Sequence, residues 1–328
     1  MKIVFGKKII NSQKQARRAY SLLELSIVIT IVSVLISGGL SVLTSSANNS
    51  KTQLTRERIA EVYKAMGVYL MNHKSLPCPA PINAIKSSDP IYGDATGTDG
   101  DCVTAGVATR GTGLVYGMVP TQDLNLASSF AEDGFGSKFT YVVAQAFTQP
   151  DTSTGFGVAT ETRLITMSDK INTTTTQVAT DDAIFVLLSH GVNKFGAYGA
   201  NSDSATQNLG KPGDIDGEEQ INYGTTKNFI VTSASSDIFD DIVFYKTRND
   251  IVSDLDALDL ILCAGTPNGD QTLSDGIAHT WPLTRYNQVA AANEECATGY
   301  KVRNTRPLKR CGAFGAWESD VVNPCYSS

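Results

Sequence analysis

An uncharged run, residues 25–50, constrains the fold of this chain most. It lies between Glu24 and Lys51, and it is long enough for a helix to cross a bilayer core, which takes about 20 residues. A carboxylate beside such a run is costly in an apolar phase and is usually kept for a partner. The run therefore predicts a helix whose lower half spans a membrane, with Glu24 as its most informative residue.

The helix is expected to continue beyond this run to about His73. Apolar residues recur there at spacings of three and four, which is typical of a helix with one buried face. Three prolines at alternate positions from Pro77 remove backbone donors and favour extended backbone, so they end the helix. The apolar stripe consists of Ile59, Val62, Tyr63, Met66 and Leu70.

A short basic leader precedes the apolar run. It ends in Arg17-Arg18-Ala19 and is followed by Tyr20 and, four residues later, by Glu24. These residues resemble the class III signal of type IV prepilins and pseudopilins, in which a glutamate is the fifth mature residue. The resemblance implies that a prepilin peptidase cuts between Ala19 and Tyr20 and methylates the new amino group of Tyr20, while the apolar helix stays on the mature protein.

The same resemblance implies a role for Glu24 in assembly. In low dielectric a carboxylate is stabilised by pairing with a positive charge, here the free amino terminus of a neighbouring pilin subunit. The alternative interpretation is a plain signal anchor, in which Glu24 lies at the level of the lipid headgroups.

Charge gives the expected orientation and excludes one class of partner. The leader holds six basic residues and no acid, so cleavage leaves 27 − 6 = 21 basic side chains against 33 acidic ones, a net charge of 21 − 33 = −12. This balance argues against nucleic acid as a partner. Positive charge flanking a membrane helix stays cytoplasmic. We therefore expect a single pass with the body on the far side of the membrane. The resemblance to prepilins implies that this is the inner membrane with a periplasmic body, and that the protein then enters a periplasmic or cell-surface filament.

The middle of the chain is expected to form an α+β body in which an antiparallel sheet packs against the upper helix. Short β-like segments are bounded there by Gly, Asn, Asp or Ser clusters. The length suggests two folded units beyond the anchor. The expected strands are 139–147, 163–167, 183–189, 229–232 and 242–247. The expected divisions are a leader at 1–19, a spine helix at 20–76, a body at 77–258 and a cysteine-rich module at 259–328.

Six cysteines without a Cys-x-x-Cys pair favour disulfides in an exported protein. A Cys78–Cys102 bridge would close a loop of about 25 residues and contribute about 3 kcal/mol on the chain-entropy model. The alternative is two free buried thiols.

Three segments of the body resemble the major pseudopilin of type II secretion. They are residues 133–136 (Asp-Gly-Phe-Gly), 189–193 (Ser-His-Gly-Val-Asn) and 239–243 (Phe-Asp-Asp-Ile-Val). The resemblance implies a calcium site with Asp240 and Asp241 as carboxylate ligands and Asn193 as a carbonyl ligand where the family has aspartate. The alternative is that these side chains cap turns. No cofactor is required. The acidic segment 214–218 lacks the spacing of a calcium loop and is expected to be a solvated turn.

The last cysteines, with Trp317, resemble a sushi module, a small β domain held by two disulfides. The resemblance implies that Cys263 pairs with Cys311 and that Cys296 pairs with Cys325. The alternative is a generic disulfide-stapled tail. Residues 263–325 are the candidate for contact with a surface ligand.

Catalysis is not expected. Ser189 and His190 are adjacent, so on a strand they point to opposite faces. The three histidines, His73, His190 and His279, lack metal-ligand spacing.

The function expected is a minor pilin or pseudopilin, a structural subunit of a type IV pilus or a type II secretion filament. The alternative is a single-pass anchored adhesin that does not polymerise.

Overall fold

The structure is a computed structural model, and it separates into two compact units, Met1–Asn49 and Ser50–Ser328. The predicted cleavage site at Ala19 and Tyr20 lies outside the described residues. These are residues 21–86, 88–95, 97, 101–102, 107–149, 155–157, 164–172, 174–200, 207–210, 217–233, 239–256, 258–263, 271–272, 278–282, 284–301, 306–312, 317–321 and 325–327.

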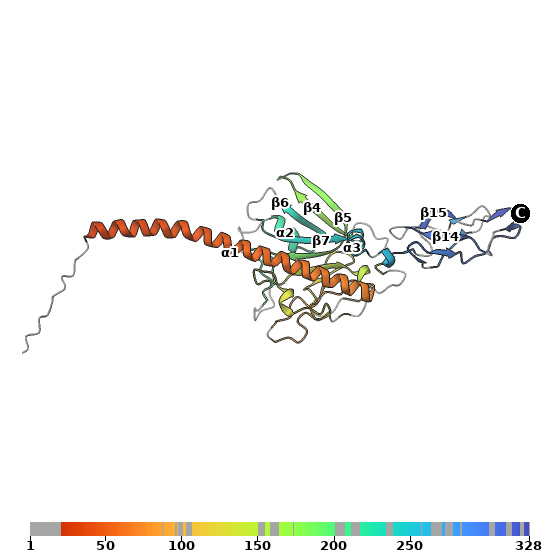
Figure 1. Cartoon of the computed structure of the whole chain (residues 1–328), viewed down its shortest axis with the longest axis horizontal. Coiled ribbons are helices and arrows are strands. Elements are labelled where there is room, and N and C mark those ends of the chain that lie inside the picture. Colours follow the sequence, from red (N-terminus) through yellow and green to blue (C-terminus); the bar gives the residue numbers. More distant parts are fainter. Residues whose placement is uncertain are drawn as a thin grey trace, which may run out of the picture. The chain divides into compact units, whose positions relative to one another are not determined.

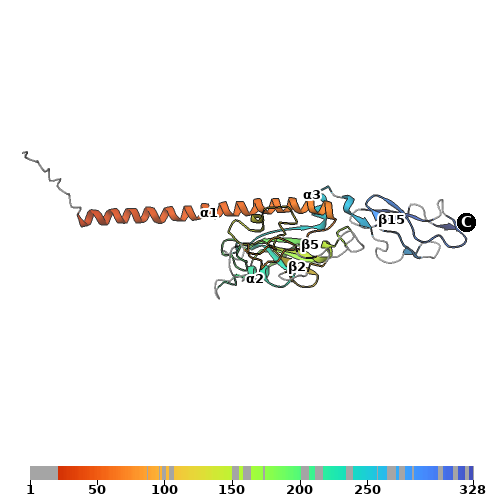
Figure 2. The same cartoon turned by 90° about the horizontal axis from the view of Figure 1, so that it is seen from below.

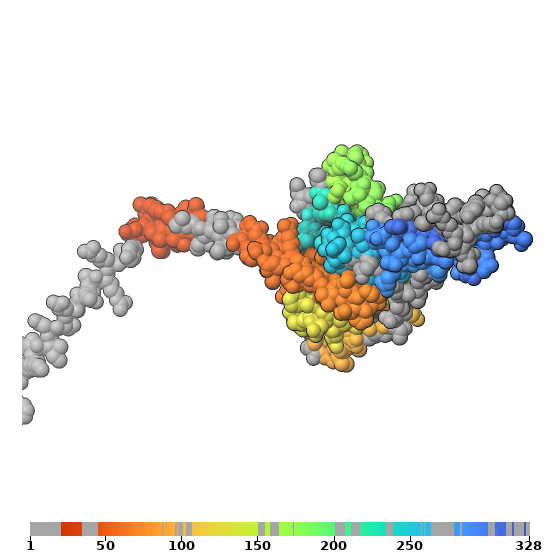
Figure 3. Space-filling view, turned by 45° about the vertical axis from the view of Figure 1, so that its right-hand side comes forward, coloured from red at the N-terminus to blue at the C-terminus, as the bar shows by residue number. Residues whose placement is uncertain are grey.

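Helix α1 runs from Leu22 to His73 and is 52 residues long. It ends where the sequence predicts, because Lys74 takes a left-handed conformation (φ 61°) just before the proline-rich segment. In the second unit, the predicted apolar stripe forms the buried face of α1: Val62 is 1% exposed, Met66 2% and Leu70 0%. Figure 3 shows this part of α1 (orange) with its other face on the surface.

The expectation of a membrane-spanning lower half is corrected. In the part of the chain that the structure describes, no helix combines the length and the apolar character that a membrane crossing requires. The polar residues from Ser45 to Ser50 belong to the same helix, so α1 is not one continuous apolar segment.

The body of the second unit is built on a seven-stranded sheet (Figures 1 and 2). Its order is β1-β2-β3-β5-β4-β6, and β7 also pairs with β5. The strands are β1 (Ala108–Thr109), β2 (Leu114–Gly117), β3 (Thr140–Ala144), β4 (Ile165–Lys170), β5 (Thr176–Ser189), β6 (Asn228–Ser233) and β7 (Ile242–Thr247).

The sheet is mixed, so the predicted antiparallel sheet is wrong. Strand β6 runs parallel to β4, with Thr166 opposite Asn228, while the other pairings are antiparallel. Parallel neighbours need a long crossover. Strand β5 and the segment after it, including helix α2 (Gly217–Tyr223), supply this crossover. Strand propensity carries no information about this crossover, so the parallel pairing could not be predicted from it.

The hydrophobic core lies between the second half of α1 and the sheet. Tyr63 of α1 meets Phe244 of β7 edge to face, with ring centroids 5.3 Å apart. The Tyr63 hydroxyl donates to Asp254 Oδ2 (2.7 Å), and Lys246 pairs with the same carboxylate (2.7 Å). Asp254 ends α3 (Arg248–Asp254), which starts with a capping box. Short 3-10 turns are η1 (Ser128–Ala131) and η2 (Gln145–Thr148).

The C-terminal part consists of small sheets around two disulfides. Cys263 pairs with Cys311 and Cys296 with Cys325, and in the body Cys78 pairs with Cys102; these are the three predicted pairings. Trp281 and Trp317 form a separate small core with the first of these bridges. The elements are η3 (Leu258–Leu260), β8 (Leu262–Cys263), β9 (Gln271–Thr272), β10 (Ala278–His279), β11 (Thr284–Arg285), β12 (Val289–Ala291), β13 (Tyr300–Lys301), β14 (Leu308–Cys311), β15 (Trp317–Val321) and β16 (Tyr326–Ser327).

Candidate functional site

The turn after β5 approaches the segment before β7 so closely that it requires glycine. Gly191 has φ +58°, and a Cβ added to it would lie 2.1 Å from Asp240 Oδ1. This approach lets the backbone N–H groups of Val192 and Asn193 donate to Asp240 Oδ2, at 2.8 and 2.9 Å. The two predicted segments, 189–193 and 239–243, are therefore brought together.

Helix α2 contacts the segment before β7 through Glu219 and Asn222, which lie one turn apart. Asn222 is fully buried and mimics a strand neighbour: its Oδ1 accepts from Ile230 N (2.7 Å) and its Nδ2 donates to Ile230 O (3.0 Å). The same amide group donates to Asp241 Oδ2 (2.8 Å). Helix α2 is thereby fixed to β6 and to the residue that precedes β7.

Arg110, just after β1, holds the C-terminal end of α2. Its guanidinium donates to the carbonyls of Ile221 (3.0 Å) and Asn222 (2.7 Å) and lies 4.0 Å from the ring centre of Phe229. Burial lowers the pKa of Arg110 to about 10, so it stays charged at neutral pH. A cation at a helix C-terminus is favourable, and Arg110 therefore helps to set the position of α2.

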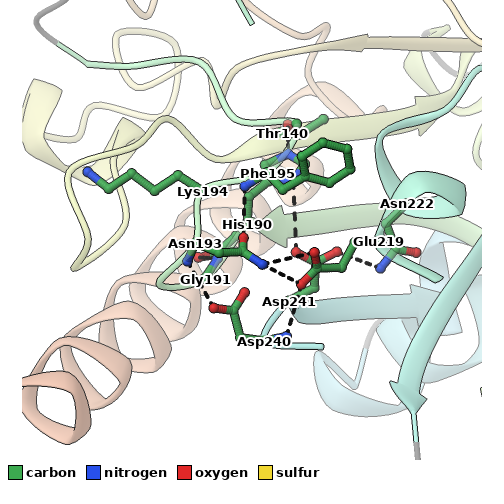
Figure 4. Close-up of polar contacts among 12 residues, drawn as sticks. Thr140, His190, Gly191, Asn193, Lys194, Phe195, Glu219, Asn222, Asp240 and Asp241 are labelled. Atoms are coloured by element: carbon green, nitrogen blue, oxygen red, sulfur yellow. Dashed lines mark hydrogen bonds and ion pairs between the residues drawn. The ribbon is translucent and has the colours of Figure 1, made fainter. Parts of the chain in front are cut away.

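Glu219 completes what we call the carboxylate cluster, Glu219, Asp240 and Asp241 (Figure 4). Oxygens of the three carboxylates lie within 4.8 Å of one another. The Asn193 side-chain nitrogen donates to both Glu219 oxygens, at 2.9 Å each. The backbone N–H of Asp240 donates to Glu219 Oε1 (3.1 Å). Burial is the largest cause that raises the pKa of the Asp240 carboxyl, and Asp133 acts in the same direction. The hydrogen bonds with Asn193, Val192 and Glu219 oppose this rise.

His190 packs beside the cluster in neutral form. Its Nε2 lies 3.1 Å from Thr140 Oγ1 and its Nδ1 lies 3.9 Å from Asp241 Oδ1. Burial is the largest cause that lowers the pKa of His190 to about 3. The ring is therefore uncharged at neutral pH despite the adjacent carboxylate.

Ser189 faces a different partner from His190. Its hydroxyl donates to Asp133 Oδ2 (2.7 Å) and is fully buried. The other oxygen of Asp133 accepts from the backbone of Phe135 and Ser137. The adjacent serine and histidine thus lie in separate hydrogen-bond networks, which is not the geometry of a nucleophile activated by a base.

The residues expected to hold calcium are close together, but Asn193 does not offer its oxygen. Asn193 Oδ1 accepts from Phe195 N (2.8 Å), so the nitrogen faces Glu219. Calcium takes about six to eight oxygen ligands. Asp240 Oδ1 is buried, and no described group donates a hydrogen bond to it. Asp241 Oδ1 is also buried and lies 3.9 Å from His190 Nδ1. Two such oxygens beside an amide nitrogen fall well short of a calcium cage, so the donor set as it stands fits this ion poorly.

A second candidate site is the start of α1. Glu24 is the acidic residue of its first turn. The large apolar side chains around it are exposed in the described structure: Leu22 87%, Leu23 70%, Leu25 53%, Ile27 51%, Val28 52%, Ile29 56%, Ile31 54%, Val32 45% and Val34 65%.

Sequence reasoning missed Glu219, Asn222 and Arg110. Residues 217–223 lie in a polar stretch, and the spacing of Glu219 and Asn222 was the one signal that both lie on one face of a helix. The predicted solvated turn at 214–218 falls mostly outside the described residues; Gly217 and Glu218 begin α2. Comparisons with protein-family models, curated proteins and solved structures found no match.

Proposed function

We propose that this protein is a pilin-like structural subunit, processed by a prepilin peptidase between Ala19 and Tyr20, that assembles with other such subunits into a filament. The observation that carries the proposal is the start of α1, where a helix presents large apolar side chains on all sides. Isolated exposed apolar residues are ordinary, but a contiguous patch of them marks an interaction site.

The distribution of these side chains favours a bundle of helices over a single groove. Leu22, Leu23 and Leu25 with Ile27, Val28 and Ile29 fall at successive positions, and at about 3.6 residues per turn they surround the helix. A helix that is apolar all round is buried in its functional state. Packing against the same helix from several copies would cover every side of it.

Glu24 gives such a bundle its register. A carboxylate enclosed by apolar helices is strongly destabilising unless it is paired. The amino group that cleavage creates on Tyr20 of a neighbouring subunit supplies a positive charge at the level of Glu24 along the axis of the bundle. We propose that this pair sets the axial offset between copies.

The C-terminal module supplies the proposed contact with a surface or partner. Its own small core, formed by Trp281, Trp317 and the Cys263–Cys311 bridge, holds it without relying on the filament helices. Residues 263–325 are therefore free to differ in role from the assembling part of the chain.

Glu24→Ala tests the proposal in cells that express the prepilin peptidase. We expect filament yield, measured by shearing and electron microscopy, to fall roughly tenfold or more, because the Tyr20 amine would be left buried and unpaired. Ser26→Ala is the matched control. Among the described residues, the Ser26 hydroxyl donates to Leu23 O of its own helix (2.8 Å), and this variant should assemble like the wild type.

Wild-type filament yield from Glu24→Ala would contradict the register role. A processed wild-type chain that stays monomeric and still binds surfaces through residues 263–325 would instead support an adhesin that never polymerises.

A further inference from the structure

We infer that helix α2 and the turn after β5 are locked together by the Asn193 amide, which takes the place of a metal ion in the carboxylate cluster. The resemblance to pseudopilins implies calcium here, and the arrangement of donors in this chain disagrees with it. The inference concerns the folded body alone, so it does not depend on filament assembly.

The first step is the position of the amide nitrogen. Asn193 Nδ2 lies 2.9 Å from Glu219 Oε1 and 2.9 Å from Oε2. An atom equidistant from both oxygens of a carboxylate is in the position that a bidentate cation takes. The Asn193 nitrogen therefore occupies the place of such an ion, and Glu219 cannot bind both at once.

The second step is that Asn193 cannot simply rotate to present its oxygen. Asn193 Oδ1 accepts from Phe195 N (2.8 Å). Exchanging oxygen and nitrogen would place an N–H donor against the N–H of Phe195 and leave the Glu219 carboxylate facing an acceptor. Both contacts would become unfavourable, so the observed orientation is the one that the surroundings select.

The third step is that the helix that carries Glu219 is itself fixed in position. Its helix is fixed by Asn222, which bonds Ile230 and Asp241, and by Arg110, which bonds the last carbonyls of α2. Figure 4 shows Glu219 and Asn222 from α2 converging on Asp241. A cation would have to displace Asn193 from a carboxylate that has little freedom to move.

The fourth step is that each member of the carboxylate cluster already accepts N–H donors. Asp240 accepts from two backbone groups, Glu219 from the Asn193 amide and the Asp240 backbone, and Asp241 from Asn222. Hydrogen bonds to the charged form favour a carboxylate in the way that a nearby cation does. For both oxygens of Glu219, for Asp240 Oδ2 and for Asp241 Oδ2, these N–H groups therefore take the place of a metal, while Asp240 Oδ1 accepts no hydrogen bond from the described residues.

Thermal unfolding of the full-length protein in detergent, with calcium or with EDTA, tests the inference. The wild-type Tm should agree in the two conditions to within about 1 °C, because a ligand that does not bind the folded state does not shift its unfolding. Asn193→Asp adds a fourth oxygen-only side chain to the three of the carboxylate cluster and removes the nitrogen. Its Tm should be lower than that of the wild type in EDTA and should rise by several degrees with calcium.

Asn172→Asp is the control for the added charge. Asn172 lies in an exposed turn, where its Oδ1 accepts from nearby backbone N–H groups, as an aspartate oxygen also would. Its Tm should be the same with calcium and with EDTA. A calcium-dependent rise of the wild-type Tm by more than about 3 °C, or a folded Asn193→Asp variant without a calcium response, would overturn the inference. If Asn193→Asp does not fold, the wild-type comparison decides the matter alone.

Discussion

At the scale of single residues, His190 makes the stability of the protein depend on pH. Its pKa is about 3 in the folded protein against 6.5 for an unperturbed histidine. Between these values the unfolded chain binds a proton that the folded one does not. The free energy of unfolding should therefore be fully retained above about pH 6.5 and should fall by up to roughly 1.4 kcal/mol per pH unit below it.

Urea unfolding of wild type and His190→Gln from about pH 7 to about pH 4 measures this effect. Glutamine does not titrate, and its side-chain amide can hydrogen-bond with the Thr140 hydroxyl as either donor or acceptor. Asp241 and Arg110 also act on this site, and both variants retain them. The difference between the two curves should therefore isolate the histidine, and parallel curves would show that His190 is not held neutral.

The role of Asn193 shows what a sequence conceals at this scale. The sequence places Asn193, Asp240 and Asp241 in motifs of the right order, and the structure does bring them together. Which end of the amide faces the carboxylates depends on Phe195 N and on Glu219. Glu219 comes from a helix that local patterns did not identify, so the donor and acceptor roles could not be predicted.

At the scale of secondary-structure elements, the buried stripe of α1 should dominate the stability of the body. Leu70 is 0% exposed and lies in the main core. Leu70→Ala removes buried methyl groups and leaves a cavity, so it should lower the free energy of unfolding by about 2–5 kcal/mol. Val68, on the same helix, is 64% exposed, and Val68→Ala should change it by less than about 0.5 kcal/mol. Equal losses would mean that this face of α1 is not docked as described.

The Cys78–Cys102 bridge is the second element-scale prediction. It joins the segment after α1 to a loop residue 24 positions away. Replacing both cysteines with alanine should lower the free energy of unfolding by about 3 kcal/mol, because the unfolded chain regains the freedom of that loop. Urea unfolding of the double variant checks this. A loss well below 1 kcal/mol would indicate that the loop is ordered without the bridge.

Elements were predictable where the signal is local. The three-and-four spacing of the stripe and the proline-rich stop placed α1 correctly up to His73, since both act within a few residues. The direction of β6 was not predictable, because it depends on where a long crossover returns the chain. Helix α2 has only seven residues in a polar stretch, too few for a clear period.

At the scale of the whole molecule, the central claim is that the leader is removed and the exposed start of α1 becomes the assembling surface. The six predicted cysteine partners are paired as in an exported protein. The mature chain would begin one residue before the described part of the molecule, so that Glu24 lies within the first turn of a helix with a free amino terminus.

Intact mass and amino-terminal sequencing of the protein, expressed with and without a prepilin peptidase, test this claim most directly. We predict a chain that begins at N-methyl-Tyr20 and that appears only when the peptidase is present. A chain that remains uncut in both cases, or that is cut within or after the apolar run by another peptidase, would contradict the account.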